Sequence, residues 1–118
     1  MVRIVDKAWG REVIFADTDL YCGKLMVFDK VGNKFSMHFH NVKDESWYVQ
    51  KGSFVLRCID TTNADIIETI LETGSIWRNY PLQPHQIEAL EDDSIIVEVS
   101  TQDSVEDNYR VFPGDSQR

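Results

Sequence analysis

Two histidines at alternate positions, His38 and His40, constrain this chain more than any other feature of its sequence. Alternate residues of a β-strand point to the same face, so the two imidazoles project side by side. Residues 41–44 follow, and they are rich in polar groups suited to a chain reversal. Glu45 then opens a second apolar stretch. The reversal is therefore predicted to bring its carboxylate back against the histidine pair.

The remaining histidine, His85, follows Pro81 and Pro84 at the start of a further predicted strand. Three imidazoles and one carboxylate form a mixed nitrogen and oxygen donor set. Such a set suits Mn, Fe, Ni, Co or Zn, and it leaves coordination positions open for water or substrate. The sequence thus predicts a site for one divalent transition metal with four ligands: His38, His40, Glu45 and His85.

Short runs of β-branched and aromatic residues recur along the chain, separated by Gly, Asn, Asp and Pro, and helical periodicity is nearly absent. This pattern is typical of an all-β sandwich or barrel. A length of 118 residues favours a single domain over residues 1–118. The polar tail from residue 101 is expected to pack along the outside or fray. The predicted strands are residues 11–15, 21–28, 34–40, 45–50, 53–59, 66–71, 75–77, 86–90 and 94–100.

The charge of the chain limits its partners. It carries 12 basic and 20 acidic residues, a formal net charge of −8, and this argues against nucleic acid or an anionic membrane as a partner. The N-terminal residues lack a long apolar region and no apolar run approaches the ~20 residues of a membrane span, so we expect a cytoplasmic protein. Cys22 and Cys58 are interpreted as two buried thiols, with a disulfide between them as the alternative.

The histidine segment resembles the first motif of the cupin superfamily, G-x5-H-x-H-x3,4-E-x6-G. Every spacing of this motif is met by Gly32, His38, His40, Glu45 and Gly52. The second cupin motif, G-x5-P-x-G-x2-H-x3-N, is met only by Gly74 and His85. The resemblance implies a jelly-roll barrel, also called a double-stranded β-helix, with the metal inside.

The chain is also similar to a narrower group, the C-terminal cupin domain of the type II mannose-6-phosphate isomerases. The similar segments are K-A-W-G-R-E at residues 7–12, E-S-W at 45–47, E-V-S-T at 98–101 and E-D-N-Y-R at 106–110. Two positions differ, because that group usually has Gln at the position of His38 and Arg at the position of Lys43. These differences weaken the inference about substrate more than the inference about fold.

Three residues are candidates for binding substrate. Trp47 lies two residues after Glu45, so it faces the interior and is suited to stack on a sugar ring, with core packing as the alternative. Arg110 is suited to an anionic group, or else to a salt bridge within the chain. Lys43 lies between the ligands, where a solvated loop lysine is the alternative. Glu88 and Glu98 alternate away from the apolar positions of their strands, which argues against either as a general base.

These observations favour a small metal-dependent cupin that acts on a sugar or sugar-phosphate, as an isomerase would. There the metal polarises a carbonyl while a base moves a proton between adjacent carbons. Two alternatives are a metal-containing binding module without turnover and an Fe(II)-dependent dioxygenase. Apolar strand edges around residues 13–15 and 25–28 predict a homodimer. The acidic residues of the tail, Asp103, Asp107 and Asp115, are interpreted as solubilising.

Overall fold

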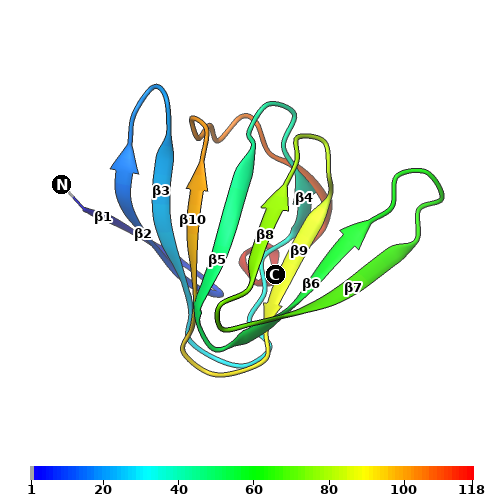
Figure 1. Cartoon of the computed structure of the whole chain (residues 1–118), viewed down its shortest axis with the longest axis horizontal. Helices are drawn as coiled ribbons and strands as arrows, with labels where there is room; N and C mark the ends of the chain where they lie inside the picture. The colour runs from blue at the N-terminus through cyan, green and yellow to red at the C-terminus, as the bar shows by residue number, and fades with distance from the viewer. Residues whose placement is uncertain (1) are drawn as a thin grey trace.

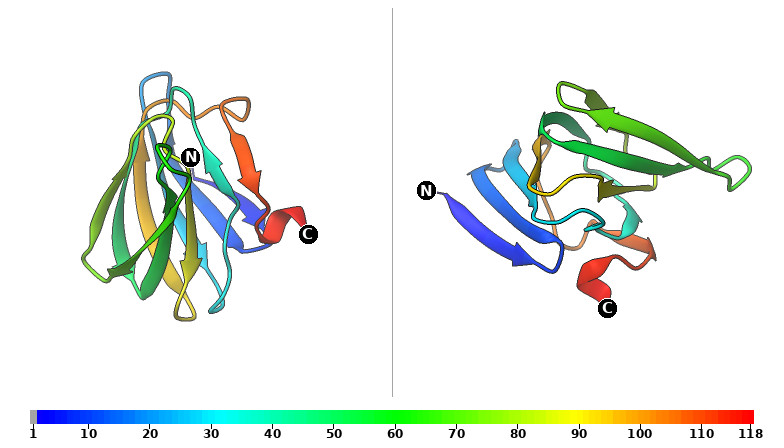
Figure 2. Two further views of the ribbon diagram at one scale, coloured as in Figure 1. Left: turned by 90° about the vertical axis from the view of Figure 1, so that its right-hand side faces the viewer. Right: turned by 90° about the horizontal axis from the view of Figure 1, so that it is seen from below.

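The computed structural model describes residues 2–118 as two antiparallel β-sheets that pack against each other (Figures 1 and 2). Sheet A contains, in spatial order, β1 (Arg3–Lys7), β2 (Gly10–Asp17), β3 (Cys22–Phe28), β10 (Ser94–Ser100), β5 (Glu45–Lys51) and β8 (Ile76–Asn79). Sheet B contains β11 (Tyr109–Phe112), β4 (Met37–Phe39), β9 (His85–Ala89), β6 (Ser53–Ile59) and β7 (Ile66–Glu72). A single 3₁₀ turn, η1 (Asp115–Gln117), follows β11. The all-β jelly roll predicted from the sequence is confirmed.

Aromatic side chains hold the two sheets together. Trp9, in the turn between β1 and β2, stacks on Phe28 with ring centroids 4.5 Å apart, and Phe28 meets Phe54 of sheet B edge-on at 5.1 Å. Pairs at these distances add to the free energy of burying the rings themselves. The core around them is completed by Met26, Phe35, Trp47, Val49, Leu56, Leu71, Ile87, Ala89 and Ile96.

Each sheet also presents one cross-strand row to the interior that is not purely apolar. In sheet A the row is Arg3, Ile14, Lys24, Glu98, Trp47 and Trp77, one residue from each strand. In sheet B the row is Arg110, His38, His85, Cys58 and Ile67. Residues in register on neighbouring strands lie within contact distance. The first row therefore brings Lys24, Glu98 and Trp47 together, and the second row brings His38 and His85 together.

The predicted strands agree with the observed ones within about two residues at each end, with one exception. The predicted strand at 34–40 is shortened to Met37–Phe39, and Lys34 forms only an isolated bridge with Glu88. Gly52 lies in the tight turn between β5 and β6 with φ of +79°, where a side chain would collide with Ser94. Two strands, β1 and β11, were not predicted, because each is short and largely exposed.

Two expectations about the whole chain can be compared with this structure. Cys22 and Cys58 are both free thiols, on β3 and β6 of opposite sheets, so the disulfide alternative is excluded. Within residues 2–118, no helix has the length and apolar character needed to cross a bilayer.

The predicted apolar edges at residues 13–15 and 25–28 are not edges. They belong to β2 and β3, which lie inside sheet A with a neighbour on both sides. These strands instead contribute to an apolar outer face, because a row of apolar and aromatic side chains in register crosses all six strands of sheet A. This outer row consists of Ile4, Val13, Leu25, Val97, Tyr48 and Ile76.

The homodimer remains a prediction, and the outer row of sheet A is the surface on which to test it. If two copies pack through this row, Tyr48→Lys places a charge in the interface and converts the dimer to a 13.7 kDa monomer. Ile70→Lys, at an exposed position of β7 in the other sheet, is the control and leaves the dimer intact. Sedimentation equilibrium distinguishes these cases. A monomeric wild type, or equal behaviour of the two variants, would contradict the prediction.

Candidate metal centre

The register of sheet B places two of the three histidines directly opposite each other. His38 on β4 pairs with His85 on β9, and their rings lie 4.7 Å apart between centroids. His40 follows β4 by one residue and keeps its ring within 5.0 Å of that of His38. Each histidine contributes one ring nitrogen to a group whose members all lie within 4.8 Å of one another. The three predicted histidine ligands therefore converge at one point.

Main-chain carbonyls orient all three rings. The Nδ1 atom lies 2.8 Å from the carbonyl oxygen of Ser36 in His38, 2.6 Å from that of Asp107 in His40, and 2.9 Å from that of Gln83 in His85. A carbonyl oxygen only accepts hydrogen bonds, so each Nδ1 carries the hydrogen and each neutral ring keeps its lone pair on Nε2. Metal-binding histidines are commonly fixed in this way by a partner on the second nitrogen.

Glu45 lies beside the histidines at the start of β5 on the opposite sheet. Its Oε1 atom is 2.8 Å from His85 Nε2, and its Oε2 atom is 4.0 Å from His40 Nε2. It is not one of the residues whose ligand atoms all lie within 4.8 Å of one another. Asn79 Nδ2 donates to Oε1 at 3.1 Å, and Lys43 Nζ lies 3.2 Å from Oε2. Glu45 as a fourth ligand is therefore a prediction that requires a test.

One buried atom indicates what this cluster lacks. His85 Nε2 is inaccessible to solvent and has no hydrogen-bond partner within residues 2–118. The atom closest to it, Glu45 Oε1, is also an electron-pair donor, so the short contact between them is unfavourable on its own. Either a proton or a metal ion between them would remove the conflict. Only a metal ion would also use the lone pairs of His38 and His40, so the residues present fit a divalent cation.

Lys43 is buried, contrary to the alternative of a solvated loop lysine. Its side chain is only 4% exposed, and its Nζ atom lies 3.1 Å from Glu98 Oε2 and 3.3 Å from Asp103 Oδ1, in addition to Glu45. Burial disfavours its charged form, but the carboxylates around it, Glu98 foremost, outweigh burial and raise its pKa. Lys43 is thus a fixed positive charge beside the histidines.

Lys24 on β3 extends the same buried network. Its Nζ atom lies 2.8 Å from Glu12 Oε2 and 3.6 Å from Glu98 Oε2. Burial again opposes its charge, and the carboxylates, beginning with Glu98, raise its pKa above the usual value. Paired in this way, the two lysines and their carboxylates offset each other's charge within the protein, as buried charges must.

Glu98 faces the interior, which corrects the inference from its alternation along β10. It is 2% exposed, and its Oε1 atom accepts a hydrogen bond from Trp47 Nε1 at 2.9 Å. Glu88 behaves as expected, because it lies away from the histidines and binds Arg57 at 3.0 Å. The inference failed for Glu98 because β10 has apolar residues on both faces: Ile96 faces the core on the same side as Glu98, whereas Val97 faces the outside of sheet A.

Two acidic residues of the tail have structural roles rather than solubilising ones. The carboxylate of Asp107 accepts hydrogen bonds from the backbone N–H groups of residues 41, 42 and 43, at 2.7–3.3 Å. These bonds fix the turn between His40 and Glu45, while the carbonyl of Asp107 orients His40. Asp115 accepts the N–H of Lys34 at 2.9 Å and so attaches η1 to the start of the histidine segment.

His38 and His40 line a cavity of about 390 Å³. It lies between the β1–β2 side of sheet A and the β11 side of sheet B, and its lining includes Trp47, Lys43 and Arg110. Trp47 is buried, with its ring edge-on to His85 at 5.6 Å, so it serves as core and as cavity wall at once. Arg110 is exposed and forms no ion pair within residues 2–118. Arg3 and Lys7 line the cavity as well.

Comparison with known proteins supports the fold. No protein-family model and no curated protein sequence matches this chain. Among solved structures, the capsular polysaccharide assembling protein CapF from Staphylococcus aureus is similar over 95% of this chain and 33% of CapF, with a TM-score of 0.80 and 20% identity. KdgF from Halomonas sp. is similar over 88% of this chain and 89% of KdgF, with a TM-score of 0.75 and 21% identity.

Oxalate decarboxylase from Bacillus subtilis is similar over 93% of this chain and 30% of that protein, with a TM-score of 0.78 and 18% identity. The chain therefore spans about a third of the length of CapF and of oxalate decarboxylase, and most of the length of KdgF. These similarities confirm the double-stranded jelly-roll fold that was expected from the histidine segment.

The metal centre leads to a direct prediction. Wild-type protein reconstituted in turn with Mn, Fe, Ni, Co and Zn should retain about one divalent ion per chain with at least one of them. His40→Ala removes one ligand and should lose most of the bound metal while remaining folded. Asn41→Ala, the exposed neighbour of His40, should bind metal like wild type. Elemental analysis after dialysis measures the content, and circular dichroism checks the fold. A wild type that binds none of these metals would contradict the assignment.

The stability of the metal-free protein should depend on pH. Burial, reinforced by His85, lowers the pKa of His38 well below the ordinary value, and burial also lowers that of His40. The unfolded chain therefore binds more protons than the folded chain below about pH 6.5, and the free energy of unfolding falls as pH decreases. The limiting slope is about 1.4 kcal/mol per pH unit for each histidine that stays neutral when folded.

Urea unfolding in the presence of a chelator, between about pH 7.5 and 5.5, measures this slope. The window stays above the range in which carboxylates titrate, so the histidines dominate it. His38→Gln should flatten the slope relative to wild type. A free energy of unfolding that is constant over the window would show that the buried rings do not resist protonation.

Proposed function

We propose that this protein is a metal-dependent enzyme of the cupin fold that acts on an anionic sugar derivative, moving a proton between adjacent carbons as an aldose–ketose isomerase does. One observation carries the proposal. Three imidazoles, those of His40 and His85 buried and that of His38 half-buried, are each oriented through Nδ1 by a main-chain carbonyl, and their ligand nitrogens cluster beside a cavity that His38 and His40 line. Three protein ligands leave positions open for water or substrate.

The anionic character of the substrate is inferred from the cations at the cavity. Lys24 and Lys43 are neutralised by buried carboxylates, so they are not available to a ligand. Arg110 and Lys7 form no ion pair within residues 2–118, and both line the cavity. In a chain of net charge −8, unpaired cations beside the histidines favour a carboxylate or phosphate group on the ligand. This local arrangement outweighs the overall charge, which by itself would favour a neutral sugar.

The chain supplies the other elements of such a reaction. A divalent ion, when bound, would act as a Lewis acid that stabilises negative charge developing on a substrate oxygen. Glu98 is the carboxylate we assign to proton transfer, since it lines the cavity and is held by Trp47 and Lys43. Lys43, fixed in its charged form, balances the carboxylates around it. The Trp47 and Phe35 rings line the same cavity and exclude water from the reacting carbons.

Similar proteins supply support of a general kind. CapF is described as a capsular polysaccharide assembling protein, and oxalate decarboxylase from Bacillus subtilis contains Mn(II) centres. The similarity to type II mannose-6-phosphate isomerases at residues 7–12, 45–47, 98–101 and 106–110 points to a sugar-phosphate. The presence of His38 where that group usually has Gln makes the metal set of this chain richer in nitrogen.

Two alternatives belong to other classes. A metal-containing module that binds a small molecule without turnover would have the same histidines and need no proton-transfer group. An Fe(II)-dependent dioxygenase would use the same open coordination positions for oxygen. Oxygen uptake with Fe(II), measured against aldose–ketose conversion with each metal, separates these three functions.

Glu98→Gln tests the assigned reaction. The amide keeps an oxygen to accept the Trp47 N–H but cannot take up a proton, so kcat should fall by about 100-fold or more. Metal content should stay close to that of wild type, because Glu98 is not a predicted ligand. Glu88→Gln, on β9 outside the cavity, is the matched control and should leave kcat unchanged.

A panel of phosphorylated and carboxylated aldoses, assayed for the ketose product by NMR, supplies the substrate for this comparison. If no member of the panel is converted with any metal, the isomerase proposal fails and the binding module becomes the better account. If Glu98→Gln retains wild-type kcat, the proton-transfer role belongs to another residue.

A further inference from the structure

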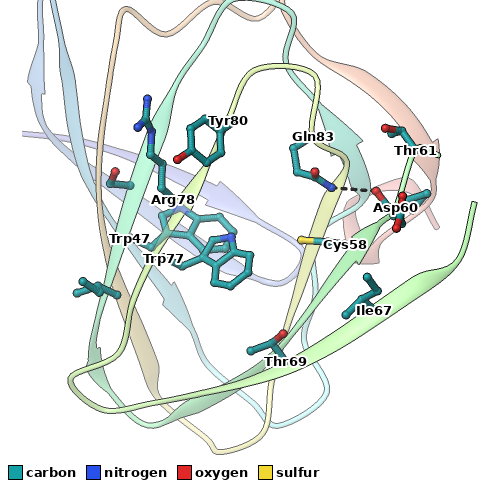
Figure 3. A pocket seen from close by; sticks show the side chains of 13 residues that line it. Trp47, Cys58, Asp60, Thr61, Ile67, Thr69, Trp77, Arg78, Tyr80 and Gln83 are labelled. Atoms are coloured by element: carbon teal, nitrogen blue, oxygen red, sulfur yellow. Dashed lines mark hydrogen bonds between the residues drawn. The ribbon is translucent and has the colours of Figure 1, made fainter. Parts of the chain in front are cut away.

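A second cavity opens on the opposite flank of the sandwich from the histidines (Figure 3). It is a groove of about 840 Å³ between β8 at the edge of sheet A and the β6–β7 hairpin of sheet B. Figure 2 shows the β6–β7 hairpin diverging from the other sheet. The volume of the groove falls within the range of about 300–1,000 Å³ that is typical of small-molecule sites.

The floor of this flank groove is hydrocarbon. Trp47 and Trp77 are cross-strand partners and form one wall. Their indole N–H groups are directed elsewhere, to Glu98 Oε1 and to Asn79 Oδ1, both at 2.9 Å. Both indole N–H groups are therefore already paired within the protein. Cys58 lines the floor too, and burial raises the pKa of its thiol to about 11, so it is neutral and apolar at physiological pH.

The groove also has an exposed apolar side. Ile67, the β7 partner of Cys58, is 53% exposed although it faces the groove. Neighbouring Ile66 is 50% exposed and does not line the groove, because alternate residues of a strand face opposite ways. A ligand in the groove would remove Ile67 and the half-buried Trp77 ring from water, which is the main source of free energy for binding apolar molecules.

The charged side chains that line the groove determine which charge on a ligand it favours. Arg78 lines the groove, but Asp44 binds its guanidinium through two hydrogen bonds, and the guanidinium lies over the Tyr80 ring at 4.2 Å. Asp60 also lines the groove. Its carboxylate accepts a hydrogen bond from the N–H of Thr62 alone and forms no ion pair within residues 2–118. The uncompensated charge of the groove is therefore negative. The groove is also lined by the aromatic rings of Trp47, Trp77 and Tyr80, and aromatic faces attract cations.

We propose that the flank groove is a second binding site, for a small amine with an aromatic or apolar body. The body lies on Trp77 and Ile67, and the ammonium group pairs with Asp60. This site is distinct from the metal centre, because none of the three histidines lines the groove, and Trp47 is the one residue that lines both cavities.

Naphthylethylamine and naphthylacetate are matched probes, since they share a ring system and differ in the sign of their charge. Titrations followed by ¹⁵N–¹H NMR would monitor the Trp77 indole and the Thr69 amide in the groove. The amine should bind saturably and about fivefold more tightly than the acetate, the difference expected for one partly exposed ion pair. Asp60→Asn should remove that difference. Binding should persist in chelator-treated protein, so failure here would leave the metal assignment unaffected.

Two charge substitutions on β7 provide the matched controls. Ile67→Arg places a cation in the groove and should abolish binding of the amine, whereas Ile66→Arg on the opposite face should preserve it. Both positions are exposed, so both variants should fold. Three results would each overturn the proposal. The amine could give no saturable shifts, the two probes could bind equally, or the two arginine substitutions could have equal effects.

Discussion

The pairing of β4 with β9 is the constraint on which the candidate metal centre depends. It is short, with His38 opposite His85 as its register pair, and it places two imidazoles on one face of sheet B. A slip of one residue would turn His38 away from the interior and replace it with a neighbour. The carbonyls of Ser36 and Gln83, two residues before each histidine, then orient the rings. The register thus sets both the position of these histidines and the direction of their free nitrogens.

The interior also contains buried charged side chains that require partners. Lys24 and Lys43 are nearly inaccessible, and each would be costly to bury alone. Glu98 lies between them and binds both, at 3.6 Å and 3.1 Å. The network also holds Glu45 beside His85, so the electrostatics of the metal centre and of the lysines are one system. An uncharged residue at position 98 would leave two cations with fewer partners.

The fold and the histidine ligands were predictable because both rest on short-range patterns. Alternation of side chains places His38 and His40 together, and the spacing from Gly32 to Gly52 matches a known motif. Residues whose role depends on distant partners were not predictable. Lys43 is 55 positions from Glu98 and 60 from Asp103, and nothing near it in sequence indicates burial. Glu98 was misread because apolar residues were assumed to face inward, whereas the outer face of sheet A is apolar and its inner face partly charged.

The bond between the Asp107 carbonyl and His40 joins residues 67 positions apart. The same loop closes the turn that leads from His40 to Glu45. Contacts of such wide sequence separation form late when a chain folds, because a long loop must be closed before they contribute. The order of assembly follows: hairpins such as β6–β7 can form early, while the orientation of His40 waits for the segment before β11 to dock. In a refolding chain, most of the two sheets would then form before His40 is oriented as a metal ligand.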